Sequence, residues 1–308
     1  MYSFLRTGLL ALIFSASVIA GEETTHRILV SGCGLGQIAI VGNNQETEWS
    51  IPFQDEVSDA VLLPNGNILH SVKKEGIREI KPDYAAGKGA ETVWQWSPPL
   101  KDGKRGETHS CQPLPGNRIL TGESFDNLSV IREIDRTTGN ILKTVELRGL
   151  GNAHGTFRQI RKTPQGTYLI TQQKNGGKAM EFDENGKLVR AFPDGRYTAV
   201  RLPNGNTLTA CGDMHRLLEL SPDGTIVWEV GQTDIPGITL GFVAGIQRLP
   251  NGNTVLCNWG GHGHTSGPAV LEITPDKKLV WSLTPRIQNR VSSIQILDPE
   301  VMKQQPLR

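Results

Sequence analysis

The chain has 308 residues, carries a formal net charge of +1 at pH 7 and is 37% hydrophobic. This length is enough for one large domain or two small ones with a full core. Because acidic and basic residues nearly cancel, the composition gives no support for a nucleic-acid partner or for binding to an anionic membrane surface.

The N-terminus has the pattern of a cleavable secretory signal. A short charged segment, MYSFLRT, precedes an apolar run from Gly8 to Ala20 that is too short to span a bilayer. Val18 and Ala20 provide the small residues of a cleavage site. We therefore expect residues 1–20 to be removed. The mature chain should start near Gly21, act in the periplasm or outside the cell, and contain no membrane span.

The rest of the sequence repeats a turn motif. The pentapeptide LPNGN occurs at 63–67, 202–206 and 249–253, and degenerate copies lie at 114–117 and 163–167. The segment 294–298 matches the residues that lead into the last full copy. These units recur about every 40 to 50 residues, which is the period of propeller blades.

Each repeat predicts four short antiparallel strands. Alternating apolar residues lead into Pro-Asn-Gly-Asn, a turn in which Gly and Asn tolerate positive φ. A second strand follows, as in ILHSV, TLTAC and TVLC, and the third strand carries a Glu–apolar pair. A second tight turn, such as SPDGT at 221–225, leads into a fourth strand that often contains Trp. Four strands of this kind make one blade.

The glutamate of the third strand recurs in five repeats, at Glu79, Glu133, Glu181, Glu219 and Glu272. A residue that returns in nearly every blade serves the scaffold, so we interpret these carboxylates as structural. Functional residues are expected where the blades depart from the repeat.

The repeats predict six blades. Five begin near Ser58, His109, Arg158, Tyr197 and Ala244. In the sixth, the C-terminal VSSIQILD supplies the inner strand, and the N-terminal HRILVSG, QIAIVG and TEWSIP supply the other three, which removes an exposed sheet edge. The prediction is an all-β fold: one six-bladed β-propeller over residues 21–308, with both termini in the closing blade.

The blade topology places the tight, repeated turns at one end of the ring and the variable loops at the other end, here called the top face. A metal site needs three or four converging ligands at about 2.0–2.2 Å. The candidate ligands on this face are His154, His215, His262 and His264, with Asp213 as an alternative to His154. The alternative interpretation is that these glycine-flanked loop histidines are solvated. The four cysteines form no metal or redox motif, and we expect free thiols.

The mouth of the central channel is the second candidate site. The residues six positions before each turn proline, or its equivalent, are Ser58, His109, Arg158, Tyr197, Ala244 and Ser292. Among them, His109, Arg158 and Tyr197 can provide a base, an anion clamp and a hydroxyl group. Candidate ligand-binding residues nearby are Glu56, Arg196 and Trp259. This polar ring predicts a small-ligand site, and a water-filled channel is the alternative.

The combination of LPNGN, Glu–apolar, Pro-Asp-Gly and a fourth-strand Trp resembles the bacterial quinoprotein-like propellers with PQQ-like repeats, including arylsulfotransferases. The segment from His109 to Asn117 is similar to the one that carries the channel histidine of arylsulfotransferases. This resemblance implies a nucleophilic His109 aided by Arg158. We expect no pyrroloquinoline quinone, because the D-x-x-T-G-x-x-x-W pattern matches only at 135–139, without its Trp, and no two cysteines are adjacent.

Two classes of function remain open. The first is an exported propeller that binds a small-molecule or carbohydrate ligand on its top face. The second is an enzyme, either a metal-assisted lyase or hydrolase that uses His154, His215, His262 and His264, or a transferase that uses His109. A converged histidine cluster would favour the enzyme and a divalent metal. The sequence favours binding, and it leaves the cofactor, the enzymatic activity and the oligomeric state open.

Overall fold

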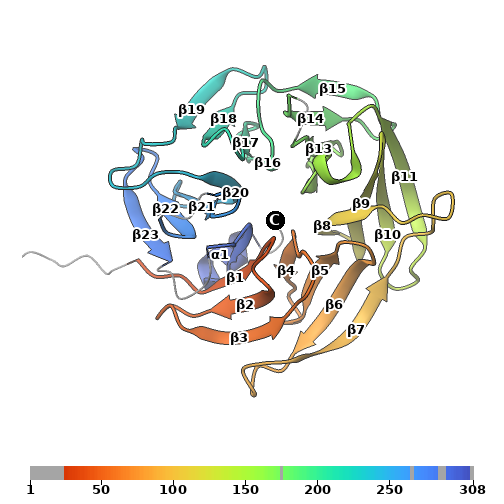
Figure 1. Cartoon of the computed structure of the whole chain (residues 1–308), viewed down its shortest axis with the longest axis horizontal. Coiled ribbons are helices and arrows are strands. Elements are labelled where there is room, and N and C mark those ends of the chain that lie inside the picture. The colour runs from red at the N-terminus through yellow and green to blue at the C-terminus, as the bar shows by residue number, and fades with distance from the viewer. Residues whose placement is uncertain (1–23, 174–175, 264–266, 284–288, 306–308) are drawn as a thin grey trace, which may run out of the picture.

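The computed structural model describes residues 24–173, 176–263, 267–283 and 289–305. Their strands form six four-stranded antiparallel sheets arranged as blades around a central axis (Figure 1). Blade 1 contains β4 (Ala60–Leu62), β5 (Ile68–Val72), β6 (Gly76–Pro82) and β7 (Ala90–Trp96). Blade 2 contains β8 (Glu107–Leu114), β9 (Arg118–Phe125), β10 (Leu128–Asp135) and β11 (Ile141–Arg148). Blade 3 contains β12 (Ile160–Lys162), β13 (Tyr168–Thr171), β14 (Ala179–Phe182) and β15 (Leu188–Ala191).

Blade 4 contains β16 (Thr198–Arg201), β17 (Thr207–Ala210), β18 (Leu217–Leu220) and β19 (Ile226–Val230). Blade 5 contains β20 (Phe242–Arg248), β21 (Thr254–Trp259), β22 (Val270–Ile273) and β23 (Leu279–Leu283). Blade 6 contains β24 (Ser293–Ile296), β1 (Ile28–Ser31), β2 (Gln37–Val41) and β3 (Thr47–Pro52). The six-bladed propeller is therefore confirmed.

Both ends of the described chain meet in blade 6, as predicted. The C-terminal β24 pairs antiparallel with the N-terminal β1, with Ile28 opposite Ile296 and Ser31 opposite Ser293. The only other described elements are the short helices η1 (Ala153–Gly155), between blades 2 and 3, and α1 (Pro299–Gln304), after β24. No helix in these parts of the chain has the length and apolarity needed to cross a bilayer. The predicted signal at 1–20 and His264 lie outside the described residues.

The core lies between neighbouring blades. The second strands are buried along their whole length, as in β5 and β17, because the sheets of both adjacent blades cover them. The outermost strands, such as β15, are mostly exposed. The second strands therefore need apolar or internally hydrogen-bonded side chains on both faces, as for Thr209, and the outer strands tolerate polar side chains.

The repeated glutamates link each blade to the next. In blade 4, Glu219 accepts a hydrogen bond from the turn residue Asn206 at 2.7 Å and another from Arg248 of blade 5, also at 2.7 Å. The corresponding pairs at other junctions are Glu79–Arg136, Glu133–Lys162, Glu181–Arg201 and Glu272–His26. One carboxylate therefore fixes a tight turn in its own blade and the position of the neighbouring blade.

The junction between blades 6 and 1 lacks both partners of this link. Ile40 pairs with the fourth-strand residue Trp49, in the place that the glutamate takes in blades 1, 4 and 5. Leu62 precedes Leu-Pro, as Arg248 does in blade 5. Ile40 and Leu62 pack in one apolar cluster. Because both partners are replaced, neither leaves a buried charge without a partner.

The replacement of the glutamate–cation pair by Ile40 and Leu62 at this junction suggests a test of the blade links. We expect Arg248→Leu alone to lower the free energy of unfolding by about 3 kcal/mol, because Glu219 loses its cationic partner in a partly buried site. The double variant Glu219→Ile/Arg248→Leu copies the blade 6–blade 1 junction and should recover most of this loss. Urea unfolding of the single and double variants measures both effects.

The exposed pair Arg148–Glu146 provides the matched control, since Arg148→Leu should change stability by less than about 1 kcal/mol. Equal effects of Arg248→Leu and Arg148→Leu would show that the blade links do not hold the ring together.

His26 closes the ring between blade 5 and the C-terminal segment. Its Nε2 lies 2.8 Å from Glu272 Oε2, and its Nδ1 lies 2.5 Å from Asp298 Oδ2. Burial alone would lower the pKa of His26. The hydrogen bonds with Asp298 and Glu272 and their negative charges outweigh burial and raise this pKa to about 9. The imidazole is therefore charged at neutral pH.

This raised pKa predicts a pH-dependent contribution to stability. The contribution of His26 is complete below its unfolded pKa of about 6.5 and is lost as the pH rises through about 9. We expect His26→Gln to cost about 3 kcal/mol at pH 6 and much less at pH 9.5. Urea unfolding of both proteins at the two pH values isolates this group, and a cost that is equal at both would contradict the charged link.

Candidate functional site

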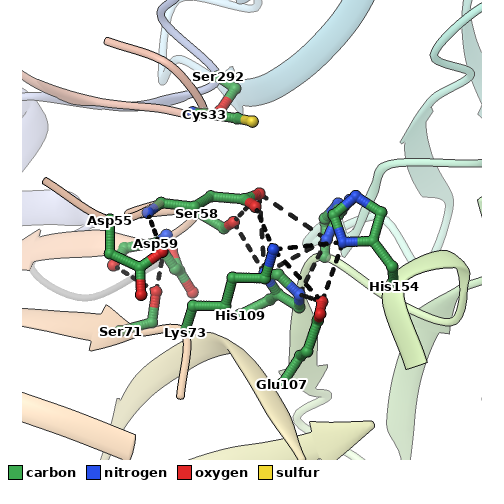
Figure 2. A network of polar contacts seen from close by, with 12 residues as sticks. Cys33, Asp55, Ser58, Asp59, Ser71, Lys73, Glu107, His109, His154 and Ser292 are labelled. Atoms are coloured by element: carbon green, nitrogen blue, oxygen red, sulfur yellow. Dashed lines mark hydrogen bonds and ion pairs between the residues drawn. The ribbon is translucent and has the colours of Figure 1, made fainter. Parts of the chain in front are cut away.

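A dense group of polar side chains lies at the channel mouth on the top face. It consists of Glu56, Lys73, Glu107, His109, His154 and Arg158, here called the mouth cluster. Glu56 and Lys73 flank the first two strands of blade 1, Glu107 and His109 lie in β8, and His154 is in η1. Figure 2 shows Glu107, His109 and His154 pointing toward one another, with Lys73 beside them. The inner-strand starts of three successive blades thus converge, as the blade register predicts.

His109 is the buried centre of the mouth cluster. Its side chain is completely inaccessible, and its Nε2 lies 3.0 Å from Glu107 Oε2 and 2.9 Å from Arg158 Nη1. Its Nδ1 lies 3.1 Å from Ser58 Oγ. Burial lowers the pKa of His109 to about 4, with help from the charge of Arg158, and outweighs the hydrogen bond with Glu107. The imidazole is neutral at pH 7.

Two imidazoles position Arg158. Its Nη1 contacts His109, and its Nη2 donates to His154 Nε2 at 2.8 Å. Glu56 Oε1 is 3.7 Å away, and only 5% of the arginine side chain is exposed. The guanidinium is therefore held in one orientation before any ligand arrives.

The two carboxylates of the mouth cluster are ionised. Burial would raise the pKa of Glu107, but hydrogen bonds with His109 and His154 and the charge of Lys73 hold it well below its usual range. Burial acts in the same direction on Glu56, where Arg158 and His109 outweigh it and lower the pKa. The cluster thus contains two negative and two positive side chains, and its charge is balanced.

A cavity of about 80 Å³ opens beside the mouth cluster. Its polar side is lined by Glu56, His154, Arg158 and Gln173. Its other side is lined by Cys33, Tyr197, Phe242, Trp259 and His262. Pockets that enclose a drug-sized molecule measure about 300–1,000 Å³. This cavity can therefore hold one end of a ligand, and the remainder must extend over the top face.

Trp259 forms a fixed wall of the cavity. Its indole N–H donates to the carbonyl of Cys33 at 3.0 Å, and the Arg290 guanidinium lies 5.4 Å from the ring centre. Gly261 packs so closely that a Cβ atom there would lie 1.7 Å from the ring. Phe242 adds an edge contact with ring centres 5.1 Å apart. Trp259 can therefore keep this position only because residue 261 is glycine.

The other predicted site residues separate into two groups. Tyr197 lines the cavity, and burial raises the pKa of its hydroxyl, which makes no hydrogen bond of normal geometry to a described residue. Arg196 turns to Asp194 at 3.3 Å and does not line the cavity. His109 is also absent from the lining, because Arg158 and His154 lie between it and the cavity.

The histidines predicted as metal ligands are found in different surroundings. His154 belongs to the mouth cluster, and His262 lines the opposite side of the cavity, where its Nδ1 lies 3.0 Å from Asp213 Oδ1. His215 Nδ1 lies 2.6 Å from the carbonyl of Gly241. Within the described ranges, the three side chains whose ligand atoms lie within 4.8 Å of one another are Glu56, His109 and His154.

This triad fits a metal ion poorly. Arg158 already contacts the Nε2 atoms of both histidines, and the Lys73 ammonium lies 3.5 Å from Glu56 Oε2. A divalent cation would have to enter between two fixed positive charges and displace both. The arrangement suits hydrogen bonding to a polar organic group better.

Several site residues were not among those predicted. They are Cys33, Lys73, Gln173 and Phe242. Lys73 had a usable signal, because it lies in the loop between the second and third strands of blade 1, as His215 and His262 do in their blades. Glu107, two residues before His109, was expected near the mouth from its place in the sequence. An irregularity of β8 between Thr108 and Ser110 interrupts the alternation of the strand, and the two side chains meet at 3.0 Å.

Solved structures with this architecture include proteins of different kinds. A protein of unknown function from Bacteroides caccae is 29% identical, with a TM-score of 0.77 over 89% of this chain and 100% of that one. Virginiamycin B lyase from Staphylococcus aureus, in a catalytically inactive histidine-to-alanine form with quinupristin, is 13% identical, with a TM-score of 0.55 over 87% of each chain. The WD40 propeller domain of Doa1 is 15% identical, with a TM-score of 0.54 over 86% and 85%.

The two likenesses at 13% and 15% identity show the propeller fold alone. No curated protein sequence matches this chain. The matching family model differs from the quinoprotein-like group that the repeats resemble, so the quinoprotein and arylsulfotransferase resemblance is supported only as far as the propeller architecture. The model of proteins like the allergen Mal s 1 matches residues 35–259, and the chain belongs to this family.

Proposed function

We propose that this protein binds a small polar ligand of sugar type, with one end in the cavity at the channel mouth. The observation that carries the proposal is the charge-balanced mouth cluster fixed beside an aromatic wall. Glu56 offers acceptors, Arg158 offers donors and Gln173 offers both. Hydroxyl groups can donate and accept, so they match such a mixed set. Tyr197 and Phe242 provide apolar contact for a ring face or edge.

The rigidity of the site supports binding. Contacts with His109 and His154 hold Arg158, and contacts with Cys33, Arg290 and Gly261 hold Trp259. A site whose groups are already oriented loses little conformational entropy when it binds. The predicted leader at 1–20 adds the proposal that this binding takes place outside the cytoplasm.

A second candidate is acid–base catalysis at His154. This side chain is 46% exposed, its Nδ1 lies 2.9 Å from Glu107 Oε2, and its Nε2 accepts a hydrogen bond from Arg158. A carboxylate orients the imidazole, and a neighbouring cation can stabilise negative charge that develops when a proton is removed. Because Arg158 occupies Nε2, a substrate must first draw the guanidinium onto its own carbonyl or carboxylate. The freed Nε2 can then abstract the neighbouring proton, as in a lyase. The complete burial of His109 speaks against the transferase alternative.

The binding proposal predicts a clear effect of Arg158→Gln. Removing the charged fork from a buried, hydrogen-bonded site should weaken the affinity for a bound sugar at least tenfold. Calorimetric titration with a panel of neutral mono-, di- and trisaccharides identifies the probe on the wild-type protein. The exposed Arg27→Gln variant is the control and should bind like wild type. Failure of every sugar to bind, or equal affinities of Arg158→Gln and wild type, would overturn the proposal.

Incubation of wild-type protein with a neutral uronic acid methyl ester trisaccharide, which has a C–H bond next to its ester carbonyl, separates binding from catalysis. Under the acid–base alternative, new NMR signals of a product appear, and His154→Gln abolishes them even at sugar concentrations that saturate the variant, so that weaker binding does not account for the loss. An unchanged sugar after prolonged incubation leaves binding as the function for that ligand.

The aromatic wall generates a separate prediction. Gly261→Ala should displace Trp259, lower the free energy of unfolding by about 1–3 kcal/mol and weaken sugar binding, because the added methyl group overlaps the indole. Near-ultraviolet circular dichroism and thermal unfolding report the change. Gly231→Ala is the matched control, because its nearest neighbours are side-chain atoms of Asp234 at 3.5 Å. Identical behaviour of the two variants would show that Gly261 is not a support of the wall.

A further inference from the structure

A larger groove lies next to the cavity on the same face. Its volume is about 660 Å³, and it is lined by loops and strand ends of blades 1 and 2. Phe125, Leu128 and Ala153 provide apolar surface, and Lys74, Lys104 and Arg105 are among the charged residues that surround it. The volume lies within the range of small-molecule pockets.

The groove carries an excess of positive charge. Five basic and three acidic residues line it. Two of the basic residues, Lys101 and Arg148, share Glu146 at 2.8 and 3.0 Å. Among described residues, no carboxylate forms an ion pair with Lys74, Lys104 or Arg105, and Arg105 donates instead to the carbonyl of Pro98. The charge of Arg105 acts on Glu123 without forming an ion pair. Lys74 and Lys104 form no ion pair with a carboxylate of the described residues, so the groove, unlike the mouth cluster, has an excess of positive charge.

The groove and the cavity meet at one pair of side chains. Glu107 lines the groove, His154 lines the cavity, and their hydrogen bond of 2.9 Å forms the wall between them. Lys73 and Lys74 are adjacent in the turn between β5 and β6. Lys73 lies 3.7 Å from Glu107, and Lys74 lines the groove. A single extended ligand can therefore occupy both hollows and pass over His154.

We propose that the groove is a second subsite, which binds the anionic part of an acidic oligosaccharide whose uncharged end occupies the cavity. This inference rests on the proposed function and specifies its ligand class. The unpaired cations supply the attraction for carboxylate or sulfate groups, and the apolar surface of Phe125, Leu128 and Ala153 faces the C–H side of a sugar ring. The ligand class is defined by the negative charge, which a uronic acid or a sulfate ester can supply.

The test compares trisaccharides that share a backbone and differ in charge. Trigalacturonate and its full methyl ester have the same ring sequence, but the ester is uncharged. A sulfated galactose trimer forms a third arm. We expect calorimetry at low ionic strength to show at least tenfold tighter binding of trigalacturonate or of the sulfated trimer than of the ester. High salt should reduce this preference. The tighter of the two anionic trimers identifies the source of the charge.

Groove variants then locate the effect. In Lys74→Gln/Lys104→Gln/Arg105→Gln the preference for the anionic trimer should be lost, and the affinity for the ester should stay within about twofold. The control Lys81→Gln/Lys187→Gln/Lys278→Gln removes three exposed charges that do not line the groove and should keep the preference. In Arg158→Gln the ester should bind at least tenfold more weakly, which reports on the cavity alone.

The outcomes separate the two proposals. Equal binding of acid and ester by wild type, or equal losses in the groove and control variants, would overturn the second subsite and leave the cavity function standing. Tight binding of the acid with no effect of Arg158→Gln would support the groove and contradict the cavity. Absence of binding by all three trimers would overturn the second subsite. It would overturn the cavity function as well only if every neutral sugar of the wider panel also fails to bind.

Discussion

A carboxylate on the third strand of one blade, bonded to a cation in the next, sets how the blades of this ring are arranged. Glu219 shows the link in its simplest form. Its carboxylate accepts one hydrogen bond from Arg248 of the next blade and another from Asn206 in the turn of its own blade. Most backbone hydrogen bonds remain within each sheet. Only a few cross between blades, such as Thr108 N–H to the Lys73 carbonyl and the pair Gly212–Val243, so side chains form most of the contacts between blades. A buried charge pair is directional, so it selects one rotation between neighbours where apolar packing tolerates several. The pair Ile40 and Leu62 shows that the same junction can also be formed without charge, provided both partners change together.

A second buried link crosses the inner strands. Asp59 of blade 1 receives two hydrogen bonds from Arg161 of blade 3, at 2.8 and 3.0 Å, and a third from the backbone of Cys111 in blade 2. Asp59 directly follows Ser58 in the sequence, and Ser58 contacts His109. The floor of the mouth is thus fixed by three blades at once. The loops above can therefore carry a residue with a strained backbone, such as His262 with φ of 52°, without loss of the ring.

The sequence predicted the parts of the molecule that follow from periodicity. Strand order, the shared closing blade and the position of Arg158 and Tyr197 at the mouth all follow from counting back from repeated turns. It did not predict that His109 lies beneath Arg158 and not in the cavity, because depth depends on side-chain packing between blades. It did not separate His215 from His262 either. Their loops are equivalent in sequence, but one histidine meets a backbone carbonyl and the other faces the cavity.

Charge placement explains why binding is favoured over metal chemistry at this mouth. His109 and His154 meet there, yet the residue that joins them is an arginine, and both imidazoles contact it. The low pKa of His109, about 4, keeps that ring neutral beside the guanidinium at pH 7, which avoids a repulsive pair of buried cations. The two carboxylates then balance Arg158 and Lys73, so the cavity can accept an uncharged polar group. The excess of positive charge, from Lys74 and Lys104, lies on the other side of the His154–Glu107 pair, in the groove. The two hollows therefore differ in the group each prefers, and one ligand with an uncharged and an anionic end would satisfy both.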